Sequence, residues 1–553
     1  MPLLEKIKTL LGQFTRHQKT FFLFLTILAG VWILCPYHNF QNLLSQGDHG
    51  FQLCCFSRVL QGEMPYRDYP WLYGPLMIYY YGLFLKLFGI SIHSVLIGQI
   101  VVNLFSGSFF YLAMSSVISP AMAFLATVWF WTYNTDFFYT YNHAGGITAL
   151  LATLYCIFLY IRAPKKSYIY FGLFFVLVFS LIKLNSGLFT LAAFFASLLF
   201  IDFFNKTSDR RAKRYRYFFL ALLGISIIGS IYWFFLRGLP LDHIRVCFPY
   251  LSSDRPYHAI PGNLFQIFWR FNTSALFNGW TNLFFGLLII FSTIQTFLLL
   301  SGKRLDKTVS DQLRLILIIL LVFCVLGLHE FFITGALFTM FWIVPLKFML
   351  MFIFLWFGIK KLPVFIRISL YALILLTAVQ QIMGQHQSIQ MVKNPYQYMP
   401  QEKAKIYVAN SVQWLDTVKK TTEYLESHLK DKELFFAIPH DSIYYYLTGR
   451  DSPTWQLEFF KFHNISPRQE REIIRQLEEK KVNYVLLSNR CDTKEAGVGT
   501  FGTTHCPLLA RYIYENFNIT ATFGNWPHEG GWAWNHGTKI LKRKNIKSAG
   551  PSP

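Results

Sequence analysis

The sequence predicts a polytopic α-helical membrane protein that ends in a soluble α/β domain, and three observations support this prediction. The 553-residue chain is 54% hydrophobic, and only 14% of its residues are charged, whereas soluble domains contain about 25%. Long apolar segments recur up to about residue 390, and charged residues become common only after it. We therefore expect a transmembrane module over residues 1–390 and a soluble domain over 391–553.

The apolar segments of the transmembrane module are candidate membrane-spanning helices, which need about 18 or more residues with few charges. The candidates are 20–36, 72–89, 93–117, 121–140, 144–162, 168–183, 187–204, 215–237, 276–300, 313–333, 336–357 and 363–383. The charges of the flanking loops conflict with counting every segment as a span. We therefore expect one segment between 93 and 140 to be short, re-entrant or interfacial. The predicted total is about 11–13 transmembrane helices.

The net charge of +22 is compatible with nucleic-acid binding, but its placement indicates a membrane topology instead. Lysine and arginine gather in short loops between apolar segments, as the positive-inside rule describes for cytoplasmic loops. These loops are 162–167, 205–216, 301–307 and 358–362. This orientation places the loops at 37–71 and 238–275 and the soluble domain on the extracytoplasmic, periplasmic side. We expect an integral protein of a bacterial inner (plasma) membrane, with membrane lipids and no nucleic acid among its partners.

The soluble domain combines predicted strands and helices. Short β-rich segments occur at 433–439, 482–489 and 519–524, and helical patterns occur at 466–481 and 506–517. Ser466 and Pro467 are typical of a helix N-terminus, as N-cap and first helical residue. The alternation predicts a small α/β domain. Because this domain has no glycine-rich phosphate loop and no obvious catalytic set, we expect a lid or an acceptor-facing module.

The eight cysteines do not indicate a metal site. None of them has the spacing of a zinc site with other cysteines or histidines. Cys491 and Cys506 both fall in the soluble domain and could form a disulfide in an oxidising compartment.

The first outer loop contains a polar and aromatic stretch between two apolar segments, from Gly47 to Leu76. After Asp48, apolar residues fall roughly on one face of a helical pattern that is too short and polar to span a membrane. This pattern predicts an interfacial helix on the outer leaflet, with Asp48 at its start. Asp48 fits two interpretations, an N-cap that accepts a backbone N–H group or a functional acid. Arg67 and Asp68 likewise suit either an ordinary surface ion pair or a binding site.

This loop resembles that of the GT-C glycosyltransferases, in particular the branch of the protein mannosyltransferases and the lipid A aminoarabinose transferase. The similar features are a first-loop aspartate, a short amphipathic helix and the stretch "GEMPYRDYPWLYGP" before the second apolar segment. "KLNSG" (183–187) is similar to that branch's K-x-N-x-G pattern, and loop 239–275 and the α/β tail also correspond. The resemblance extends over most of the chain and implies the GT-C fold.

Members of this superfamily transfer a sugar from a polyprenyl-phosphate donor to an acceptor outside the cytoplasm. The resemblance therefore implies an inverting membrane glycosyltransferase whose acceptor is a glycan, a lipid or a protein. Asp48 matches the first-loop aspartate and is the expected general base, which deprotonates the acceptor. His49 stands where relatives often carry a second acid, so we expect no metal and no other cofactor.

The other expected site residues bind the donor or the acceptor. A phosphate leaving group needs positive charge as its bond to the sugar breaks. We assign substrate contacts to His49, Tyr66, Arg67, Asp68, Lys183, Asn185, Arg270, His329, Glu330 and Lys347. Other interpretations stay open, because Lys183 suits a snorkelling lysine, and His329 and Glu330 suit solvated residues of an outer loop at 329–335.

Two further functional classes compete with the transferase. A transporter or flippase of lipid-linked sugars often contains internal repeats, but the sequence shows no convincing repeat. Its polar residues also concentrate on one face of the membrane rather than along a path across it. A non-catalytic relative that binds polyprenyl phosphate within a larger assembly is the other alternative.

Overall fold

Residue contacts divide the chain into two compact units. The helical unit comprises Met1–Pro36, Gln99–Ile231 and His258–Gln390, and the mixed unit comprises Tyr37–Gly98, Tyr232–Tyr257 and Met391–Pro553. The mixed unit therefore adds the whole of the first predicted outer loop and part of the second to the predicted soluble domain. The structure is a computed structural model, and it describes residues 2–35, 40–41, 45–133, 141–204, 210–248, 311–334, 341–359, 362–385, 395–409, 414–493, 498–531 and 535–544.

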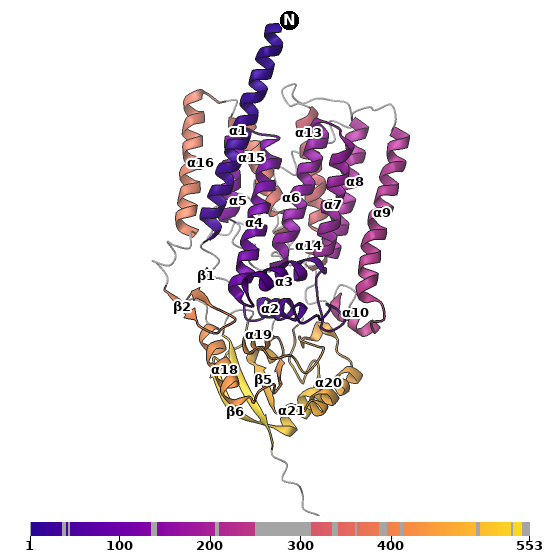
Figure 1. Ribbon diagram of the computed structural model, residues 1–553, viewed down its shortest axis with the longest axis vertical. Helices are drawn as coiled ribbons and strands as arrows, with labels where there is room; N and C mark the ends of the chain where they lie inside the picture. Colours follow the sequence, from indigo (N-terminus) through magenta and orange to yellow (C-terminus); the bar gives the residue numbers. More distant parts are fainter. Residues whose placement is uncertain are drawn as a thin grey trace, which may run out of the picture. The chain divides into compact units, whose positions relative to one another are not determined.

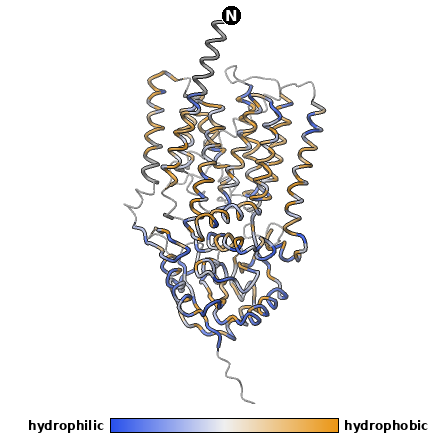
Figure 2. Tube along the Cα trace, in the orientation of Figure 1, coloured by the Kyte–Doolittle hydropathy of each residue, from blue (hydrophilic) through white to orange (hydrophobic). Residues whose placement is uncertain are grey.

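The described residues include six helical segments that are long and apolar enough to cross a membrane. They are His17–Leu34 of α1 (Pro2–Leu34), α4 (Ile92–Ser115), α6 (Tyr141–Arg162), α8 (Leu184–Phe204), Ala212–Leu236 of α9 (Arg210–Leu236), and Asp311–Phe332, which covers α13 (Asp311–Gly327) and the start of α14 (His329–Thr334). Shorter apolar helices are α3 (Leu76–Phe88), α5 (Pro120–Tyr133), α7 (Lys166–Ile182), α15 (Val344–Ile359) and α16 (Val364–Gln385). Figure 2 shows their hydrophobic character. The protein is an integral membrane protein, as predicted, and the candidate span at 276–300 lies outside the described residues.

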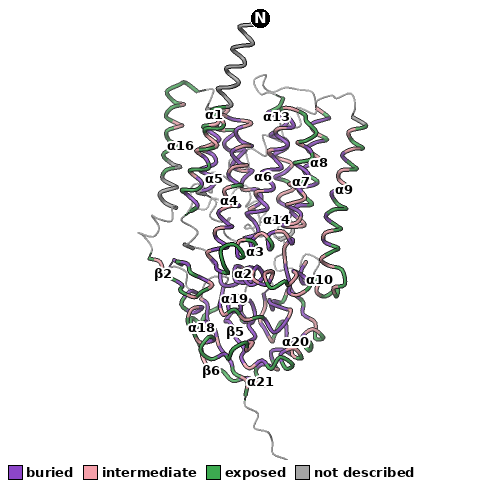
Figure 3. The backbone as a smooth tube through the Cα atoms, viewed as in Figure 1, coloured by how far each residue is buried: buried purple, intermediate pink, exposed green. Residues whose placement is uncertain are grey.

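The helical unit buries some of its helices and exposes others. Helices α6, α7 and α8 pack against one another, and α13 packs against α8 (Figure 1). Most of α6 is buried, whereas α9 and α16 expose much of their surface (Figure 3). The exposed side chains of these two helices are large and apolar, for example Phe219 and Phe365. Such a surface suits contact with lipid, where unpaired polar groups are costly.

The mixed unit contains a four-stranded sheet in the order β4-β5-β7-β6 (Figure 1). Its strands are β4 (Phe435–Ile438), β5 (Tyr484–Ser488), β6 (Phe517–Gly524) and β7 (Gly537–Arg543). β4 and β5 are parallel, and β7 is antiparallel to both β5 and β6. A parallel pair needs a crossover connection, and the chain between β4 and β5 includes α20 (Pro467–Glu479). The three strands that the sequence predicts are confirmed, and β7 is a fourth that it does not predict.

The predicted start of α20 is confirmed. The Ser466 hydroxyl accepts a hydrogen bond from the Gln469 backbone N–H, and the Gln469 side chain accepts one from the Ser466 N–H. Pro467 is the first helical residue.

The other helices of the mixed unit include α2 (Asp48–Val59), α10 (Leu241–Cys247), α18 (Leu415–His428), α19 (Ile443–Thr448), α21 (Pro507–Asn516), and the short η5 (Lys461–His463) and η6 (Asn489–Cys491). The thiols of Cys491 and Cys506 are buried and free, so the disulfide that the sequence leaves open is not formed.

A second, three-stranded sheet joins the first predicted outer loop to residues that follow α16. β1 (Phe40–Gln41) pairs in parallel with β3 (Ile406–Ala409), and β2 (Tyr396–Met399) pairs with β3 in antiparallel fashion. The backbone N–H of Ile92 also donates to the carbonyl of Lys403 at 2.9 Å. These long-range backbone contacts explain why the first outer loop belongs to the mixed unit.

Helix α2 packs against α3 and α19 and is buried on nearly every side. Gln52 and Arg58, which lie opposite the apolar face of the helical pattern, are both buried. The Arg58 guanidinium pairs with Glu63, donates to the Asp68 carbonyl at 3.1 Å and lies 4.7 Å from the centre of the Tyr69 ring. The helix that the sequence predicts after Asp48 is therefore confirmed, whereas its position at a membrane interface stays a prediction.

We expect Gly50→Ala to destabilise the mixed unit, because Gly50 lies directly against α19. A Cβ at this position would lie 2.5 Å from Cβ of Ile443 and 2.9 Å from its backbone nitrogen. Overpacking of this kind costs about 1–3 kcal/mol. The matched control is Gly82→Ala in α3, whose new Cβ would meet Val59 Cγ1 at 3.6 Å, an ordinary contact distance. Thermal unfolding of the purified chain in detergent measures both, and equal melting temperatures for the two variants would contradict the prediction.

Candidate active site

Asp48 is the first residue of α2, and its side chain is 31% exposed. The N-cap position is occupied by Gly47, so the interpretation of Asp48 as the N-cap is wrong. Its carboxylate instead faces a histidine from the C-terminal part of the mixed unit, with Oδ1 of Asp48 3.5 Å from Nε2 of His440. A carboxylate in a first helical turn is also stabilised by the positive end of the helix dipole.

His440, Glu458 and His463 form a buried row behind Asp48. Nε2 of His440 lies 2.7 Å from Oε1 of Glu458, and Nε2 of His463 lies 3.4 Å from Oε2 of the same carboxylate. The His440 and Glu458 side chains are only 3% and 6% exposed. Although burial disfavours a charged carboxylate, the facing imidazoles of His440 and His463 hold the pKa of Glu458 well below its ordinary value. Asp48 is thus the accessible end of a row of titratable groups.

Arg490 fixes the protonation of the His440 ring. Nη1 of Arg490 lies 2.9 Å from Nδ1 of His440, and a guanidinium can only donate hydrogen bonds. Nδ1 of His440 is therefore the acceptor, and the proton of the neutral ring is on Nε2, which faces the carboxylates of Asp48 and Glu458. Among the residues that the structure describes, this Nε2 has no hydrogen-bond partner of good geometry, although both carboxylates lie within ion-pairing distance.

Gly47 allows the start of α2 to approach the His440 ring. A Cβ at this position would lie 2.6 Å from Nδ1 of His440 and 3.2 Å from Nη1 of Arg490. The first of these distances is shorter than any ordinary contact, so a side chain here would displace the ring. The glycine before Asp48 is therefore part of the geometry that places the carboxylate beside the imidazole.

Asp441 and His536 form a second buried pair next to His440. Nε2 of His536 lies 3.8 Å from Oδ1 of Asp441 and 2.9 Å from the hydroxyl oxygen of Tyr444. Burial raises the pKa of Asp441 to about 6, against the lowering effect of the Ser488 hydroxyl and of His440. Burial also lowers the pKa of His536 to about 3. The imidazole of His536 therefore stays neutral at all ordinary pH values, whereas the Asp441 carboxyl takes up a proton slightly below neutral pH.

We expect Asp441→Asn to stabilise the folded chain at pH 7–8 and to have little effect at pH 4. The pKa of Asp441 is higher in the folded chain than in the unfolded chain, so ionisation of this carboxyl is less favourable in the folded chain. The folded chain therefore loses stability as the pH rises from about 4 to about 6. Asparagine cannot ionise, so the variant avoids this loss of stability, which amounts to roughly 2–3 kcal/mol above pH 6. Thermal denaturation in detergent between pH 4 and 8 measures it, and an equal gain at pH 4 would contradict the assigned cause.

His49 and Tyr66, both predicted to bind substrate, have structural contacts in the mixed unit. The buried His49 ring accepts a hydrogen bond from the Ser45 backbone N–H at 2.9 Å. Tyr66 is fully buried, donates its hydroxyl proton to the Tyr73 carbonyl and stacks on the ring of Phe248. These contacts indicate that both side chains shape the loop, and a role in substrate binding stays a prediction.

Arg67 and Asp68 line an open cleft of about 670 Å³ in the mixed unit. The Arg67 guanidinium is 54% exposed and forms a 2.7 Å ion pair with the Asp68 carboxylate. Asp68 also accepts a hydrogen bond from the Met64 backbone N–H, and the bond from Arg67 lowers the pKa of its carboxyl. The cleft is lined by further polar residues that include Ser452, Thr454, Trp455, Arg475 and Lys480. The structure thus brings these two predicted site residues to an accessible polar surface.

A second cluster of predicted residues lies in the helical unit, at the junction of α7 and α8. Nζ of Lys183 lies 2.7 Å from Oε1 of Glu330, and the Glu330 side chain is only 1% exposed. Asn185 and Ser186 donate to the same carboxylate oxygen, at 2.9 and 3.2 Å. Lys183 also lies over the ring of Trp342, 5.6 Å from its centre. The structure therefore brings Lys183, Asn185 and Glu330 together as one polar network.

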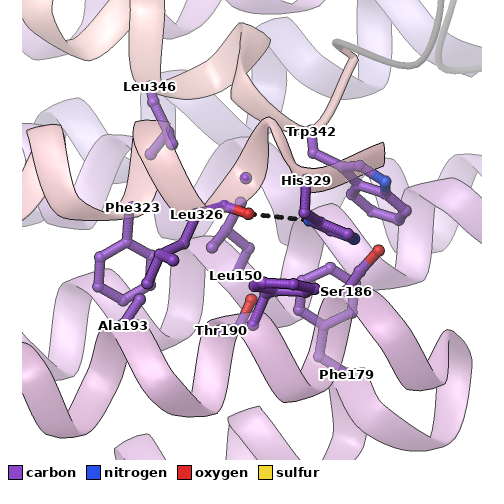
Figure 4. A pocket seen from close by; sticks show the side chains of 12 residues that line it. Leu150, Phe179, Ser186, Thr190, Ala193, Phe323, Leu326, His329, Trp342 and Leu346 are labelled. Atoms are coloured by element: carbon purple, nitrogen blue, oxygen red, sulfur yellow. Dashed lines mark hydrogen bonds between the residues drawn. The ribbon is translucent and has the colours of Figure 1, made fainter. Parts of the chain in front are cut away.

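His329 completes this network and lies beside a small cavity (Figure 4). Its Nδ1 donates to the Leu326 carbonyl at 2.8 Å, so Nε2 is the acceptor for the Asn185 amide at 3.3 Å. The cavity volume of about 10 Å³ suits a single water molecule. Both His329 and Glu330 are buried in helix α14. Their interpretation as solvated residues of an outer loop is therefore wrong.

The remaining predictions have different outcomes. Arg270 lies outside the described residues, and Lys347 is a half-buried residue of α15. Sequence reasoning missed His440, which faces Asp48, and also Glu458 and Arg490, which contact His440. One available signal was the position of His440 just after the buried strand β4, because ligands of open α/β sheets bind beyond the carboxyl ends of strands. No group of three or more potential metal ligands is found among the described residues, and metal independence stays a prediction.

Comparison with known proteins shows that this chain is similar in fold to several solved structures. The sequence matches no protein-family model and no curated protein. The structure is similar to ArnT from Cupriavidus metallidurans in the apo state, with a TM-score of 0.54 and 9% identity over 94% of this chain and 97% of that one. For the same protein bound to undecaprenyl phosphate the TM-score is 0.53, with 10% identity over 96% and 99% of the chains.

A third similar structure comes from an archaeon. It is the oligosaccharyltransferase AglB from Archaeoglobus fulgidus, in complex with an inhibitory peptide and a dolichol-phosphate. Its TM-score is 0.51, with 12% identity over 95% of this chain and 76% of that one. At these identities the similarity concerns the fold alone. The chain is an integral membrane protein with the helical membrane architecture and C-terminal α/β region of the GT-C glycosyltransferases.

Proposed function

We propose that this protein is an inverting glycosyltransferase that moves a sugar from a polyprenyl-phosphate donor to an acceptor outside the cytoplasm, with Asp48 as general base. The fold supports the reaction class, because one similar structure is bound to undecaprenyl phosphate and another to a dolichol-phosphate. The motif resemblance in the first outer loop supports the branch that includes the protein mannosyltransferases. The acceptor is then a glycan, a lipid or a protein hydroxyl.

The observation that carries the proposal is the environment of Asp48. A general base must be ionised and must reach the proton that it removes. The Asp48 carboxylate is partly exposed, begins a helix and faces the buried His440 imidazole. These features place the carboxylate at an accessible helix start, where it can reach the hydroxyl group of an acceptor. An inverting transfer needs one such base, since the acceptor oxygen attacks the sugar carbon directly and the phosphate leaves from the opposite side.

The phosphate leaving group requires cationic groups, and Arg67 and Lys183 are the described candidates. Each cation is paired with a carboxylate, Asp68 and Glu330 respectively. An arginine has five N–H donors, so Arg67 retains donors for phosphate oxygens while Asp68 holds its guanidinium in place. Arg67 is the more accessible, because it lies at the open cleft of the mixed unit. The assignment of Arg270 stays a prediction.

The proposal is tested with the purified full chain in detergent and radiolabelled undecaprenyl-phosphate hexoses and pentoses. An extracted cell-envelope fraction serves as mixed acceptor. We expect consumption of one donor, release of free undecaprenyl phosphate and label in the acceptor, with equal rates in the presence of EDTA. Movement of intact donor across proteoliposomes without consumption would support the flippase instead. Donor binding without turnover for every sugar would support a non-catalytic relative.

A further inference from the structure

We infer that the open cleft of the mixed unit binds the acceptor and that this acceptor is an uncharged glycan chain. This inference rests on the proposed function and deepens it, because it selects one of the three acceptor classes. The cleft has a volume of about 670 Å³, within the range of about 300–1,000 Å³ that ligand sites occupy. Its walls come from residues 58–68 of the first predicted outer loop, from 452–455, and from 475–480 at the end of α20.

The composition of the cleft argues against a lipid ligand and favours a ligand rich in hydroxyl groups. Every lining residue except Gly62 and Trp455 has a polar or charged side chain. An acyl or polyprenyl chain needs apolar walls, because the burial of apolar surface drives its binding. A hydroxyl group both donates and accepts hydrogen bonds. A sugar therefore suits walls that offer donors and acceptors side by side.

The charges of the cleft are largely balanced, which favours an uncharged ligand. Three arginines of the walls each pair with a carboxylate that also lines the cleft. The pairs are Arg58–Glu63, Arg67–Asp68 and Arg475–Glu479. A strongly anionic acceptor would meet three carboxylates here, and a cationic acceptor would meet the arginines. Hydrogen bonds to ionised groups are about twice as strong as those between neutral groups, so these pairs can hold the hydroxyl groups of a neutral glycan.

Trp455 gives the cleft an aromatic surface that is fixed in place. Its ring stacks on the His243 ring of α10, with ring centres 3.8 Å apart, and its Nε1 donates to the Tyr66 carbonyl at 3.3 Å. The half-buried indole lines the cleft, where its electron-rich ring can pack against the C–H groups of a sugar. Nζ of Lys480 donates to the Pro453 carbonyl at 2.6 Å and so joins two of the walls. The cleft is therefore prearranged, which lowers the cost of binding.

A protein acceptor suits this cleft less well. Peptide segments are recognised by a strand edge, by an apolar groove, by an aromatic groove for proline-rich segments or by an arginine cluster for acidic ones. None of the described lining residues belongs to a strand, and the walls are polar. Each arginine of the walls also has its own carboxylate. The cleft thus lacks the features of each of these recognition modes.

Helix α2 connects the cleft to the proposed base. Asp48 is the first residue of this 12-residue helix, and Arg58 in its last turn lines the cleft. An acceptor that fills the cleft and also presents a hydroxyl group to Asp48 must extend along the helix. A chain of sugars therefore suits the cleft better than a single sugar. In the reaction this hydroxyl group loses its proton to Asp48, its oxygen bonds to the donor sugar, and the phosphate leaves with the electron pair of the old bond.

The inference is tested with Glu479→Gln and Trp455→Leu in the transfer reaction of the purified full chain. Arg67 is left unchanged, because it is also a candidate for the donor phosphate. The acceptor is the glycan part of a cell-envelope fraction, freed of protein by protease and of lipid by mild acid hydrolysis and solvent extraction. We expect each variant to raise the apparent KM for this glycan by about 2–10-fold, the change expected from loss of one hydrogen bond or one aromatic contact. The effect on kcat should be smaller, since the cleft binds the acceptor away from the reacting atoms.

The matched control is Glu472→Gln. Glu472 lies on the same helix and pairs with the same arginine, 2.6 Å from Nη2 of Arg475, but it is not among the described residues that line the cleft. Its variant should retain the wild-type KM. Because the Glu479 side chain is 56% exposed, Glu479→Gln should fold normally, and melting temperatures check this.

Three results would overturn the inference. Wild-type KM values in both cleft variants would do so and leave the proposed function standing. Label that enters only the protein or only the lipid of the unfractionated acceptor would likewise overturn the glycan and leave the transferase standing. A wild-type chain that consumes no donor would overturn the proposed function and this inference together.

Discussion

Asp48→Asn will lower the rate of sugar transfer by about 10²–10⁴-fold and leave the melting temperature nearly unchanged. Loss of a general base has this effect on the chemical step, whereas asparagine preserves the size of the side chain and its place beside His440. The small change in stability follows from the position of Asp48. The N-cap of α2 is Gly47, so the substitution removes no N-cap side chain, and an exposed first-turn charge contributes only about 0.3–1 kcal/mol.

The matched control is Asp416→Asn in α18. Asp416 is likewise an aspartate in a first helical turn, but it is exposed and pairs with Lys420 at 2.7 Å. Both substitutions remove one carboxylate from a helix N-terminus, and only the first should affect transfer. Rates come from radiolabelled donor consumption and melting temperatures from thermal denaturation of the same preparations. Full turnover in Asp48→Asn would contradict the assignment of Asp48 as the general base.

Much of the fold follows from local sequence patterns. Apolar segments identify the membrane helices, since the spans that the structure describes fall within or beside predicted segments. The capping residues Ser466 and Pro467 correctly place the start of α20, because a cap is a contact between near neighbours in the chain. β7 escapes the same reasoning. Its sequence "GTKILKR" has three basic residues in seven, and it is stabilised by pairing with β5 and β6 rather than by its own propensity.

The candidate site could be predicted only in part, because its geometry depends on tertiary contacts. Asp48 is recognisable from the motif around it, but its partner His440 is remote in sequence and is brought near it by the packing of α2 against α19. Helix α2 shows the same limit. Its pattern has one apolar face and one more polar face, yet Arg58 on the polar face is buried, where it pairs with Glu63 and donates to the Asp68 carbonyl.

The membrane-embedded residues illustrate a second reason for wrong interpretations. His329 and Glu330 follow an apolar span, and two polar residues at the end of a span usually mark a loop. The structure buries Glu330 because Lys183, Asn185 and Ser186 compensate its charge. These partners come from the junction of α7 and α8, a distant part of the sequence. A buried charge therefore becomes predictable only when both members of the pair are recognised together.

That compensation leads to the largest expected effect on stability. Glu330→Gln will destabilise the folded chain by about 3–5 kcal/mol, because removing the buried carboxylate leaves the Lys183 ammonium, which is only 12% exposed, without its counter-charge. The glutamine carbonyl can still accept from Asn185 and Ser186, so the loss reports mainly the ion pair. The matched control is Glu472→Gln in α20, which breaks the exposed 2.6 Å pair with Arg475. Exposed pairs contribute at most about 1 kcal/mol.

The double variant Lys183→Met with Glu330→Gln separates the two possible causes of the loss. If the loss arises from an uncompensated charge, removing that charge as well should restore most of the stability, since a buried pair replaced by neutral side chains is often no less stable. Denaturant unfolding of the four chains in detergent micelles gives the coupling energy directly. A double variant as unstable as the sum of the single ones would mean that packing around Trp342, rather than charge, holds this network together. Lys183 would then be too weakly coupled to Glu330 for the carboxylate to orient it toward a phosphate.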